Sequence, residues 1–596
     1  MIKNALGIFS FRLSIAAFTV FLVLLIYSGS LGGPFLFDDG NNILDNPHIR
    51  ITQLTWENLM QAGFESPLAN RPAAYMSFAL NYYLGGYHAG GYRLVNVLIH
   101  ILAGFFLYLF FKTTLSLPAV QRRYGIHPWL PYIAALIWLV HPLHTQSVTY
   151  IVQRMTSMAA MFFVLSMWLY ARARLAAGRW QRGLLSAGCL LSGVLALGTK
   201  EIAATLPFFI FLYEWYFFQD LSRAWLKRGL IFGAAMLLVI IGVSYLYLGG
   251  QPFAKLAAGY QGRDFTMGQR MLTEFRVVML YLSLVFYPHP GRLNLDYDFP
   301  VSHSLLNPAT TLLSLSGIIA GLILAGRLAR QDRLLSFCLL WFFANLALES
   351  SIIGLELVFE HRTYLSSMLI ILMVLILAKR YPMSKALGIA AICSVVLICC
   401  AWTFERNSVW RSAVAIWQDT VTKSPQKARA HNNLGNALKS KGDFAGAIAH
   451  YRQALKINPN YPKAYNNLGT ALAGQGNPEQ AVEQFEHALR LNPAYAEAYN
   501  NIGAALAGQN KFKEAAAYFA EALRLRPDHA GTYNNMGAAL VKLGRLQDAL
   551  AHFTAALRLS PRDEATRKNI DICLRLMHDK AAASRPPAVA GGSRKN

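Results

Sequence analysis

The chain has 596 residues, of which 55% are hydrophobic and only 14% are charged. Soluble globular proteins carry about 25% charged residues, so this composition excludes a wholly soluble protein. The net charge is +24, but lysine and arginine cluster beside apolar segments, which is typical of membrane-protein loops and requires no nucleic-acid partner. The six cysteines lack the spacing of a disulfide framework or a metal site.

Apolar segments that approach the length of a membrane span follow one another from residue 13 to residue 402. The first begins near the N-terminus, and we interpret it as a span rather than a signal peptide, because no convincing cleavage site follows it. The segment 271–287 is also apolar, but it contains Glu274 and Arg276. We expect it to lie on the outer face of the membrane or to dip into it. The expected spans, eleven in all, are 13–31, 92–111, 131–147, 156–171, 183–199, 201–218, 229–248, 309–327, 334–348, 363–378 and 386–402.

A basic cluster follows every even-numbered span of this series. The cluster after the fourth span, for example, contains Arg172, Arg174, Arg179 and Arg182. Because short cytoplasmic loops are rich in lysine and arginine, we expect a multi-pass protein of the inner (plasma) membrane with a cytoplasmic N-terminus. The loop at 33–91 and the C-terminal part of the chain would then lie outside the cytoplasm.

A repeat of 34 residues begins after residue 405, with NNLG at 432–435 and 466–469, NNIG at 500–503 and NNMG at 534–537. This period, with proline in register, is the tetratricopeptide (TPR) signature, a helix–turn–helix repeat. We therefore predict an all-α fold, a polytopic helix bundle followed by a TPR α-solenoid. The expected parts are a membrane domain at 1–404, a half-repeat junction at 405–427, four repeats at 428–563, a capping helix at 564–580 and a disordered tail at 581–596.

One asparagine per repeat falls on the same helix face, and these residues are Asn433, Asn467, Asn501 and Asn535. A ladder of amides could hydrogen-bond the backbone of an extended peptide without reading its side chains. The alternative is that the amides only serve the packing of the repeats. Residues 405–596 contain 26 basic and 15 acidic residues, a net charge of +11.

Ionisable residues from at least five loops are assigned to the outer side of the membrane. Any one of them could be a snorkelling side chain or a structural ion pair, but their convergence favours a functional site. A carboxylate beside an apolar wall can serve as a general base, and basic residues suit a phosphate. These residues are Asp38, Asp39, Arg71, His141, His144, Arg154, Lys200, Glu201, Arg292, Asp296, Asp298, Glu360, His361 and Arg362.

Asp38 and Asp39 are adjacent, so their side chains diverge. One is expected to act as the base and the other to hold the loop, and the sequence leaves the choice open. His141 and His144 lack a neighbouring cysteine or carboxylate, so we expect no zinc there. No cofactor is required, although a divalent cation held by carboxylates and water is left open. The expected donor-binding residues are Arg71, His141, His144, Arg154, Lys200, Glu201, His361 and Arg362.

The membrane part resembles the C-type glycosyltransferase fold through an aspartate pair in the first outer loop. With the C-terminal repeats, the whole chain resembles the transmembrane-and-tetratricopeptide protein O-mannosyltransferases and their bacterial relatives. The strings that carry this resemblance are FLFDDGNNILDNPHI (35–49), HPLHTQSVTYIVQR (141–154), GTKE (198–201) and FEHRTYL (359–365). The resemblance implies a base at Asp38 or Asp39, a polyprenyl-phosphate-linked sugar as donor, and contacts to the lipid phosphate from Arg154, Lys200, His361 and Arg362.

The implied reaction is a single displacement at the anomeric carbon, which inverts that centre. A carboxylate takes the proton of a Ser or Thr hydroxyl on an exported protein held by the repeats, and the polyprenyl phosphate leaves. Two alternatives stay open at this point. The protein could be a non-catalytic TPR scaffold in the envelope, or it could modify a lipid or glycan instead of a protein.

Overall fold

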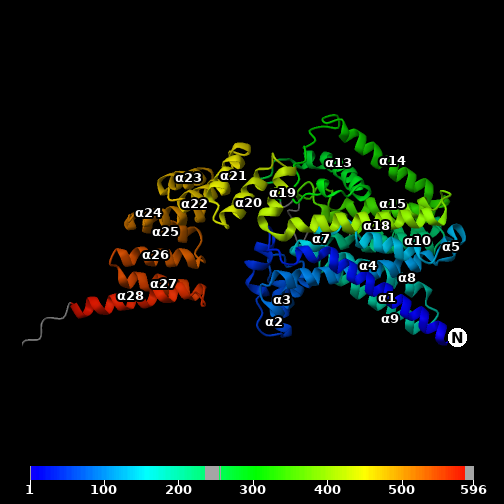
Figure 1. Cartoon of the computed structure of the whole chain (residues 1–596), viewed down its shortest axis with the longest axis horizontal. Coiled ribbons are helices and arrows are strands. Elements are labelled where there is room, and N and C mark those ends of the chain that lie inside the picture. The colour runs from blue at the N-terminus through cyan, green and yellow to red at the C-terminus, as the bar shows by residue number, and fades with distance from the viewer. Residues whose placement is uncertain (1, 126, 232, 235–253, 255–256, 584–596) are drawn as a thin grey trace, which may run out of the picture. The chain divides into compact units, whose positions relative to one another are not determined.

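The computed structural model describes residues 2–125, 127–231, 233–234, 254 and 257–583 (Figure 1). Most of the expected span at 229–248 and the tail from residue 584 lie outside these ranges. The chain divides into two compact units, Met1–Lys423 and Ser424–Asn596. Every regular element among the described residues is helical, as the sequence predicts.

Five helical segments of the described residues are long and apolar enough to cross a membrane: Leu13–Ser30, Ala89–Leu115, Ile151–Leu175, Thr310–Gln331 and Lys385–Arg411. A sixth would be the bent pair Glu360–Ser366 and Met368–Ala378, which meet at 59°. The eleven-span count therefore stays a prediction. The corresponding long helices are α1 (Ile2–Tyr27), α4 (Ala89–Leu115), α8 (Arg154–Leu175), α14 (Thr310–Gln331) and α18 (Lys385–Ser408).

The other helices of the first unit are shorter. They are α2 (Trp56–Phe64), α3 (Pro72–Gly85), α5 (Pro118–Tyr124), α6 (Leu130–Leu139), α9 (Arg179–Leu197), α10 (Leu206–Phe217), α13 (Met267–Phe286), α15 (Arg333–Ala347), α16 (Thr363–Ser366), α17 (Met368–Ala378) and α19 (Ala413–Lys423). Single turns are η1 (Ser28–Ser30), η2 (Gly40–Leu44), η3 (Pro47–Ile49), η6 (Glu201–Thr205), η7 (Pro290–Arg292), η8 (Glu360–Arg362) and η9 (Val409–Arg411).

The span expected at 131–147 is broken, because α6 ends at Leu139. Pro142 lacks a backbone N–H and disfavours helical backbone at the residue before it. The chain continues as the short elements η4 (Pro142–His144), α7 (Thr145–Thr149) and η5 (Ile151–Gln153) before α8 begins. Every residue from Val140 to Val152 is buried. This buried segment, residues 140–153, is called the central segment below.

Helix α13 covers the apolar stretch expected at the outer face, and it is not among the candidate spans. Its buried side carries Arg270 and Glu274 as well as valines. The Glu274 carboxylate forms an ion pair with Arg270, with 2.5 Å between Oε1 and Nη1, and the same oxygen lies 3.8 Å from Nη1 of Arg362. Glu274 is therefore a member of a buried charge cluster rather than a marker of an exposed interface.

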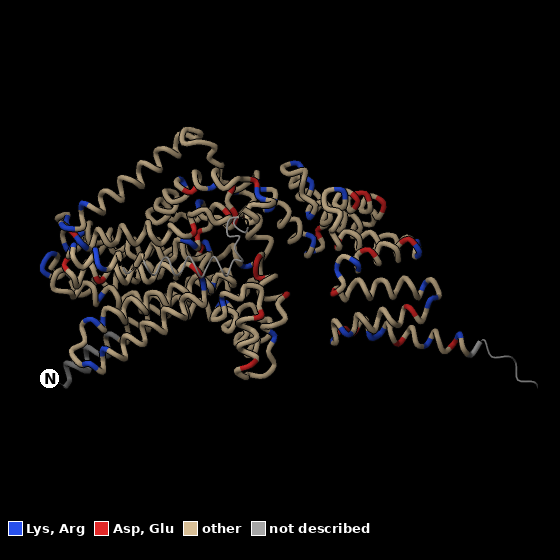
Figure 2. The backbone as a smooth tube through the Cα atoms, turned by 180° about the vertical axis from the view of Figure 1, so that it is seen from behind, with Lys and Arg blue, Asp and Glu red and all other residues tan. Residues whose placement is uncertain are grey.

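Lys and Arg of the first unit gather at the end of the bundle where α5 and the N-terminus lie (Figure 2). Asp332, between α14 and α15, is buried there, and its carboxylate contacts some of these basic side chains. Its carboxylate pairs with Arg123 at 3.3 Å and with Arg380, and it accepts a hydrogen bond from the Tyr124 hydroxyl. One buried carboxylate thus fixes a basic side chain of α5 and another from the segment after α17.

The second unit is a series of antiparallel helix pairs (Figure 1). A glycine of each first helix faces an aromatic ring of the second helix. A Cβ atom at Gly435, Gly469, Gly503 or Gly537 would lie 2.5–2.7 Å from that ring. The helices are α20 (Ala428–Lys439), α21 (Phe444–Ile457), α22 (Pro462–Gly474), α23 (Pro478–Leu491), α24 (Ala496–Gly508), α25 (Phe512–Leu525), α26 (Ala530–Lys542), α27 (Leu546–Leu559) and α28 (Glu564–Ala583).

Gly503→Ala should destabilise the third helix pair by about 1–3 kcal/mol, because the new methyl group would meet the buried ring of Phe519 at 2.7 Å. Hydrogen exchange of the α24 and α25 amides in the full-length protein should accelerate. Gly508→Ala is the matched control, since nothing lies within 4 Å of its added Cβ. Equal exchange rates in both variants would contradict this account of the glycine.

Candidate active site

The two aspartates of the first loop lie in different surroundings. Asp39 is fully buried, and its carboxylate accepts the N–H of Leu36 at 2.9 Å and the N–H of Val152 at 2.8 Å. Burial raises the pKa of Asp39 to about 7, although both N–H donors lower it. Asp38 is partly exposed, and its backbone N–H donates to the Tyr150 hydroxyl at 2.7 Å. The structure therefore separates a fully buried carboxylate that holds the loop from an aspartate that is only partly buried.

The central segment holds this loop from several sides. Arg93 of α4 donates to the carbonyls of Gly33 and Pro34 in the loop and to the carbonyl of Thr149 in the segment. Asn96, one turn further along α4, donates to the carbonyls of Val148 and Ile151 at 3.0 and 3.2 Å. Polar side chains of one long helix thus satisfy the backbone that Pro142 leaves outside a regular helix.

The same segment also contacts the FEHRTYL string. The Gln146 side-chain oxygen accepts the backbone N–H of His361 at 2.9 Å and lies 3.2 Å from His361 Nδ1. The ring of His144 lies 5.1 Å from the ring of Tyr364, measured between centroids. Two motifs that are more than two hundred residues apart in the chain therefore meet.

Basic side chains approach His361 from the GTKE string and from the start of α3. Lys200 donates to Thr156 Oγ1 at 3.0 Å and pairs with Glu349 at 3.0 Å. Arg71 binds the Glu201 carboxylate through two nitrogens, at 2.8 and 3.1 Å. Both cations are close enough to His361 to act on it electrostatically. Two quoted strings and the start of α3 thus bring together, in one region, the expected donor residues Arg71, Lys200, Glu201 and His361.

A hydrogen bond joins this basic region to the aspartate loop. The hydroxyl of Tyr75, one turn after Arg71 in α3, donates to the Asn42 side chain at 2.7 Å. The Asn42 amide in turn donates to the carbonyl of Asp38 at 2.9 Å. The loop with Asp38 is therefore fixed to the helix whose first turn carries Arg71.

Other expected donor residues are occupied by the protein itself. Arg154 is fully buried, and all three of its nitrogens donate to protein groups, namely Asn96, Ser77 and the Tyr92 carbonyl. Arg362 is buried and donates to the carbonyls of Leu357 and Glu356. These contacts argue against phosphate binding by either arginine.

The histidine pair is also turned inward. His141 is buried, and its Nε2 is 3.1 Å from the carbonyl oxygen of Val285. His144 is fully buried among the rings of Trp138, Tyr364 and His141. Among the residues that the structure describes, no group of three or more His, Cys, Asp or Glu side chains is placed to hold a metal ion.

Sequence reasoning missed the groups that hold the site together. Gln146 and Tyr150 lie in the quoted string HPLHTQSVTYIVQR, so the string signalled its importance without showing which residues contact the loop. Glu349, the buried partner of Lys200, stands outside every quoted string. Asn42 lies in the first quoted string, whereas Tyr75 lies outside every string. Their hydrogen bond was not predicted, because hydrogen-bond partners in different elements cannot be matched from one sequence.

The repeat asparagines form a ladder between repeats. In the second, third and fourth repeats the second asparagine of the NN pair donates to the first asparagine of the preceding repeat, and Asn569 of α28 closes the series. This arrangement favours the packing role, which the sequence left as an alternative to peptide binding. The donor–acceptor pairs, at 2.9–3.1 Å, are Asn467–Asn432, Asn501–Asn466, Asn535–Asn500 and Asn569–Asn534.

Asn433 of the first repeat is not one of these inter-repeat pairs and so differs from Asn467, Asn501 and Asn535. Its side-chain nitrogen is buried and has no hydrogen-bond partner among the described residues. Its oxygen accepts from Asn432 at 3.3 Å. The four expected peptide-binding asparagines are therefore not equivalent.

Comparison with known proteins gives matches to both units. A family model described as "TPR repeat" matches residues 435–476, and one described as "Tetratricopeptide repeat" matches 466–530 and 503–564. Human "Protein O-mannosyl-transferase TMTC4" is 31% identical over 166 residues, which are 26% of this chain and 22% of the relative. "Protein O-mannosyl-transferase F38B6.6" of Caenorhabditis elegans is 23% identical over 438 residues, 71% of this chain and 59% of the relative.

Among solved structures, the repeats are similar to "YrrB: a TPR protein with an unusual peptide-binding site". That match has 23% identity and a TM-score of 0.23, and it covers 28% of this chain and 81% of the other. The chain spans 22% and 59% of the lengths of the two mannosyl-transferases above. The homologues of this chain are TMTC-family protein O-mannosyl-transferases, and the resemblance to the transmembrane-and-tetratricopeptide O-mannosyltransferases that the sequence indicates is confirmed.

Proposed function

We propose that this protein is a membrane glycosyltransferase that moves a sugar from a polyprenyl-phosphate donor to Ser or Thr of exported proteins. The observation that carries the proposal is that the two aspartates lie in different surroundings. Asp39 is buried and holds the loop, whereas Asp38 is partly exposed. The homologues supply the class of reaction. A C-type fold with an inverting mechanism and about eleven spans fits this proposal.

Asp38 serves as the general base. A base must reach the proton that it removes, and the partly exposed Asp38 is accessible while both oxygens of the buried Asp39 accept backbone N–H groups. Asp38 takes the hydroxyl proton as the oxygen attacks the anomeric carbon. The bond from that carbon to the phosphate oxygen breaks, and the polyprenyl phosphate leaves.

Arg71 binds the phosphate, and the buried Lys200 adds positive charge to the same region. The Arg71 side chain is 21% exposed. Its Nε and Nη2 bind Glu201, and its Nη1 lies 3.3 Å from the Met155 sulfur. An arginine fork matches phosphate geometry. Positive charge placed where the leaving group develops its negative charge stabilises the transition state. A divalent cation is not needed in this scheme.

The repeats hold the acceptor polypeptide close to the membrane, outside the cytoplasm. Binding there raises the effective concentration of acceptor hydroxyls at the site. The basic clusters after the even-numbered spans predict a cytoplasmic N-terminus, and the repeats would then lie on the other side of the inner membrane. No step of the scheme involves a nucleic acid.

Asp38→Asn should lower the rate of sugar transfer from polyprenyl-phosphate mannose by about 10²–10⁴-fold, the range that general-base catalysis contributes. Its donor affinity should stay within a few-fold of the original. Asp39→Asn should instead loosen the loop by about 1–3 kcal/mol, because one backbone N–H would face an amide NH₂ group. Faster hydrogen exchange of residues 36–44 checks that effect.

The two variants separate the roles clearly. Full activity of Asp38→Asn would rule out Asp38 as the base, even if Asp39→Asn were inactive. A wild-type protein that transfers no sugar to any peptide, lipid or glycan acceptor would support the scaffold alternative instead.

Arg71→Gln should raise the KM for the donor by about 10–100-fold, since it removes a hydrogen bond to a charged group. Glu201→Gln is the matched control, because it removes the partner of Arg71 but keeps the cation. We expect Glu201→Gln to leave the donor KM unchanged or lower it. Equal losses in both variants would show that the ion pair matters only for structure.

A reporter enzyme that is active only outside the cytoplasm should be active when fused after residue 580. The expected odd number of spans and the cytoplasmic N-terminus give this result. Fusion of the same reporter after residue 175, beside Arg172 and Arg174, should be inactive and serves as the control. A cytoplasmic location for residue 580 would contradict the shared side of the repeats and the site.

A further inference from the structure

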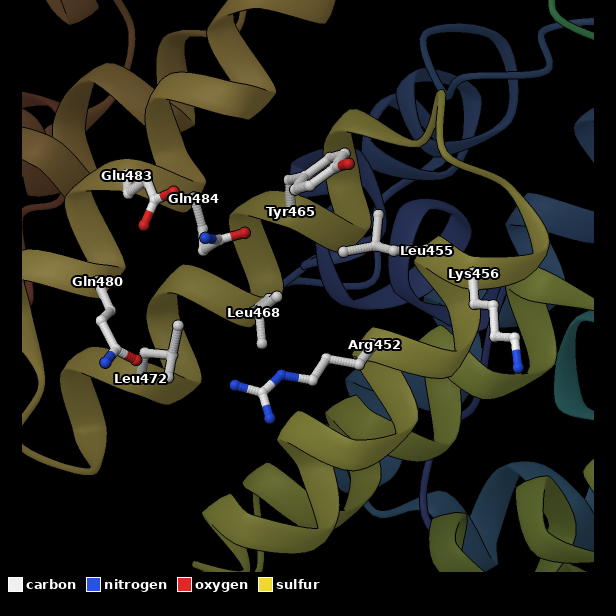
Figure 3. A pocket seen from close by; sticks show the side chains of 9 residues that line it. All are labelled: Arg452, Leu455, Lys456, Tyr465, Leu468, Leu472, Gln480, Glu483 and Gln484. Carbon is white, nitrogen blue, oxygen red and sulfur yellow. The ribbon is translucent and has the colours of Figure 1, made fainter.

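A cavity of about 540 Å³ opens within the second unit among α21, α22 and α23 (Figure 3). Its apolar surface comes from Leu455, Leu468 and Leu472, of which the last two are buried. Tyr465 of α22 adds an aromatic ring. The exposed polar lining residues are Arg452, Lys456, Gln480 and Glu483, and Gln484 is half-buried.

The cavity coincides with a departure from the repeat pattern. In the other three repeats an aromatic ring of the first helix packs against an aromatic ring of the second, nineteen residues later in the chain. The centroid distances are 5.3 Å for His431–His450, 6.2 Å for Tyr499–Tyr518 and 5.8 Å for Tyr533–His552.

Gln484 stands where His450, Tyr518 and His552 carry their rings. The corresponding first-helix ring, Tyr465, stacks instead on His487 at 5.2 Å, one turn further along α23. The place that a ring fills in the sister repeats therefore holds an amide, and Gln484 and Tyr465 both line the cavity there.

We infer that this cavity binds an aromatic side chain of a polypeptide partner, which takes the place of the ring that Gln484 replaces. The sister repeats show that an aromatic ring is complementary to this position of the fold. The cavity is larger than one ring, since about 300–1,000 Å³ accommodates a drug-sized ligand. Room therefore remains for the neighbouring backbone of the partner.

The charged residues at the opening of the cavity, here called the rim, indicate which residue of the partner stands next to its aromatic residue. Arg452 and Lys456 carry two positive charges against the single negative charge of Glu483. Within the part of the chain that the structure describes, neither cation forms an ion pair. Arg452 extends from α21 toward the side of Leu468 and Leu472 (Figure 3). The preferred segment is an aromatic residue followed by an acidic one.

The identification of this segment with the acceptor polypeptide rests on the proposed function, but binding itself does not. The first experiment therefore uses full-length protein in detergent micelles without any sugar donor. The probe is a short fluorescein-labelled Gly/Ser peptide with one central Phe-Asp pair, followed by fluorescence anisotropy. Replacing the peptide's Phe by Ala should weaken binding about tenfold or more.

Gln484→Tyr should fill the cavity with the ring that Tyr518 supplies in the next repeat, and it should weaken binding about tenfold. Because sister repeats carry a ring at this position, the variant should fold, with unchanged hydrogen exchange in α22 and α23. Gln484→Ala keeps the cavity open and should retain binding. Tyr518→Phe is the matched control, since it keeps its ring and should bind the peptide like the wild type.

Charge reversal tests the rim. Arg452→Glu should weaken binding of the Phe-Asp peptide several-fold and improve binding of a Phe-Lys peptide. Equal affinity for peptides with Phe or Ala, or undiminished binding by Gln484→Tyr, would overturn the inference. A protein that binds as expected but transfers no sugar would overturn the proposed function and leave the pocket intact. A protein that transfers sugar while its binding ignores Gln484 would overturn only the pocket.

Discussion

The central segment, residues 140–153, is the constraint on which both halves of the candidate site depend. Pro142 interrupts the helical hydrogen bonding after α6, inside a region where every residue from Val140 to Val152 is buried. Buried backbone groups without partners are costly. Their partners here are side chains such as Asn96 and Arg93, together with the carboxylate of Asp39. The site is thus built from groups that the break in the helix makes necessary.

This constraint also explains why two adjacent aspartates are found beside an apolar region. The backbone N–H of Val152 needs an acceptor, and Asp39 supplies it while it also accepts the N–H of Leu36. That arrangement fixes the turn of the loop. The neighbouring residue Asp38 is only partly buried, and its backbone N–H donates to the Tyr150 hydroxyl of the same central segment. The central segment therefore contacts both aspartates of the pair.

The sequence predicted an all-helical fold, the repeats and the meeting of distant motifs, because these follow from hydropathy, from the 34-residue period and from loop charge. It could not predict which side chains form hydrogen bonds or ion pairs with one another. Arg154 and Arg71 are both outer arginines in sequence, yet one is enclosed by Asn96, Ser77 and Tyr92 while the other faces an exposed carboxylate. The break at Leu139 depends on one proline within an apolar run. The asparagine ladder was visible as a period, but its pairing between repeats depends on the stacking distance.

That ladder changes what the solenoid can use for recognition. An amide that already bonds the next repeat has less capacity left for a peptide backbone, and the pairs recur through all four repeats up to α28. The repeats are therefore less able to bind a peptide backbone in the same way along their whole length. Selectivity has to come from positions at which one repeat differs from its neighbours. A repeat protein keeps its fold when one ring is replaced, because each repeat contacts mainly the next. Departures such as Gln484 can consequently serve binding at little cost to stability.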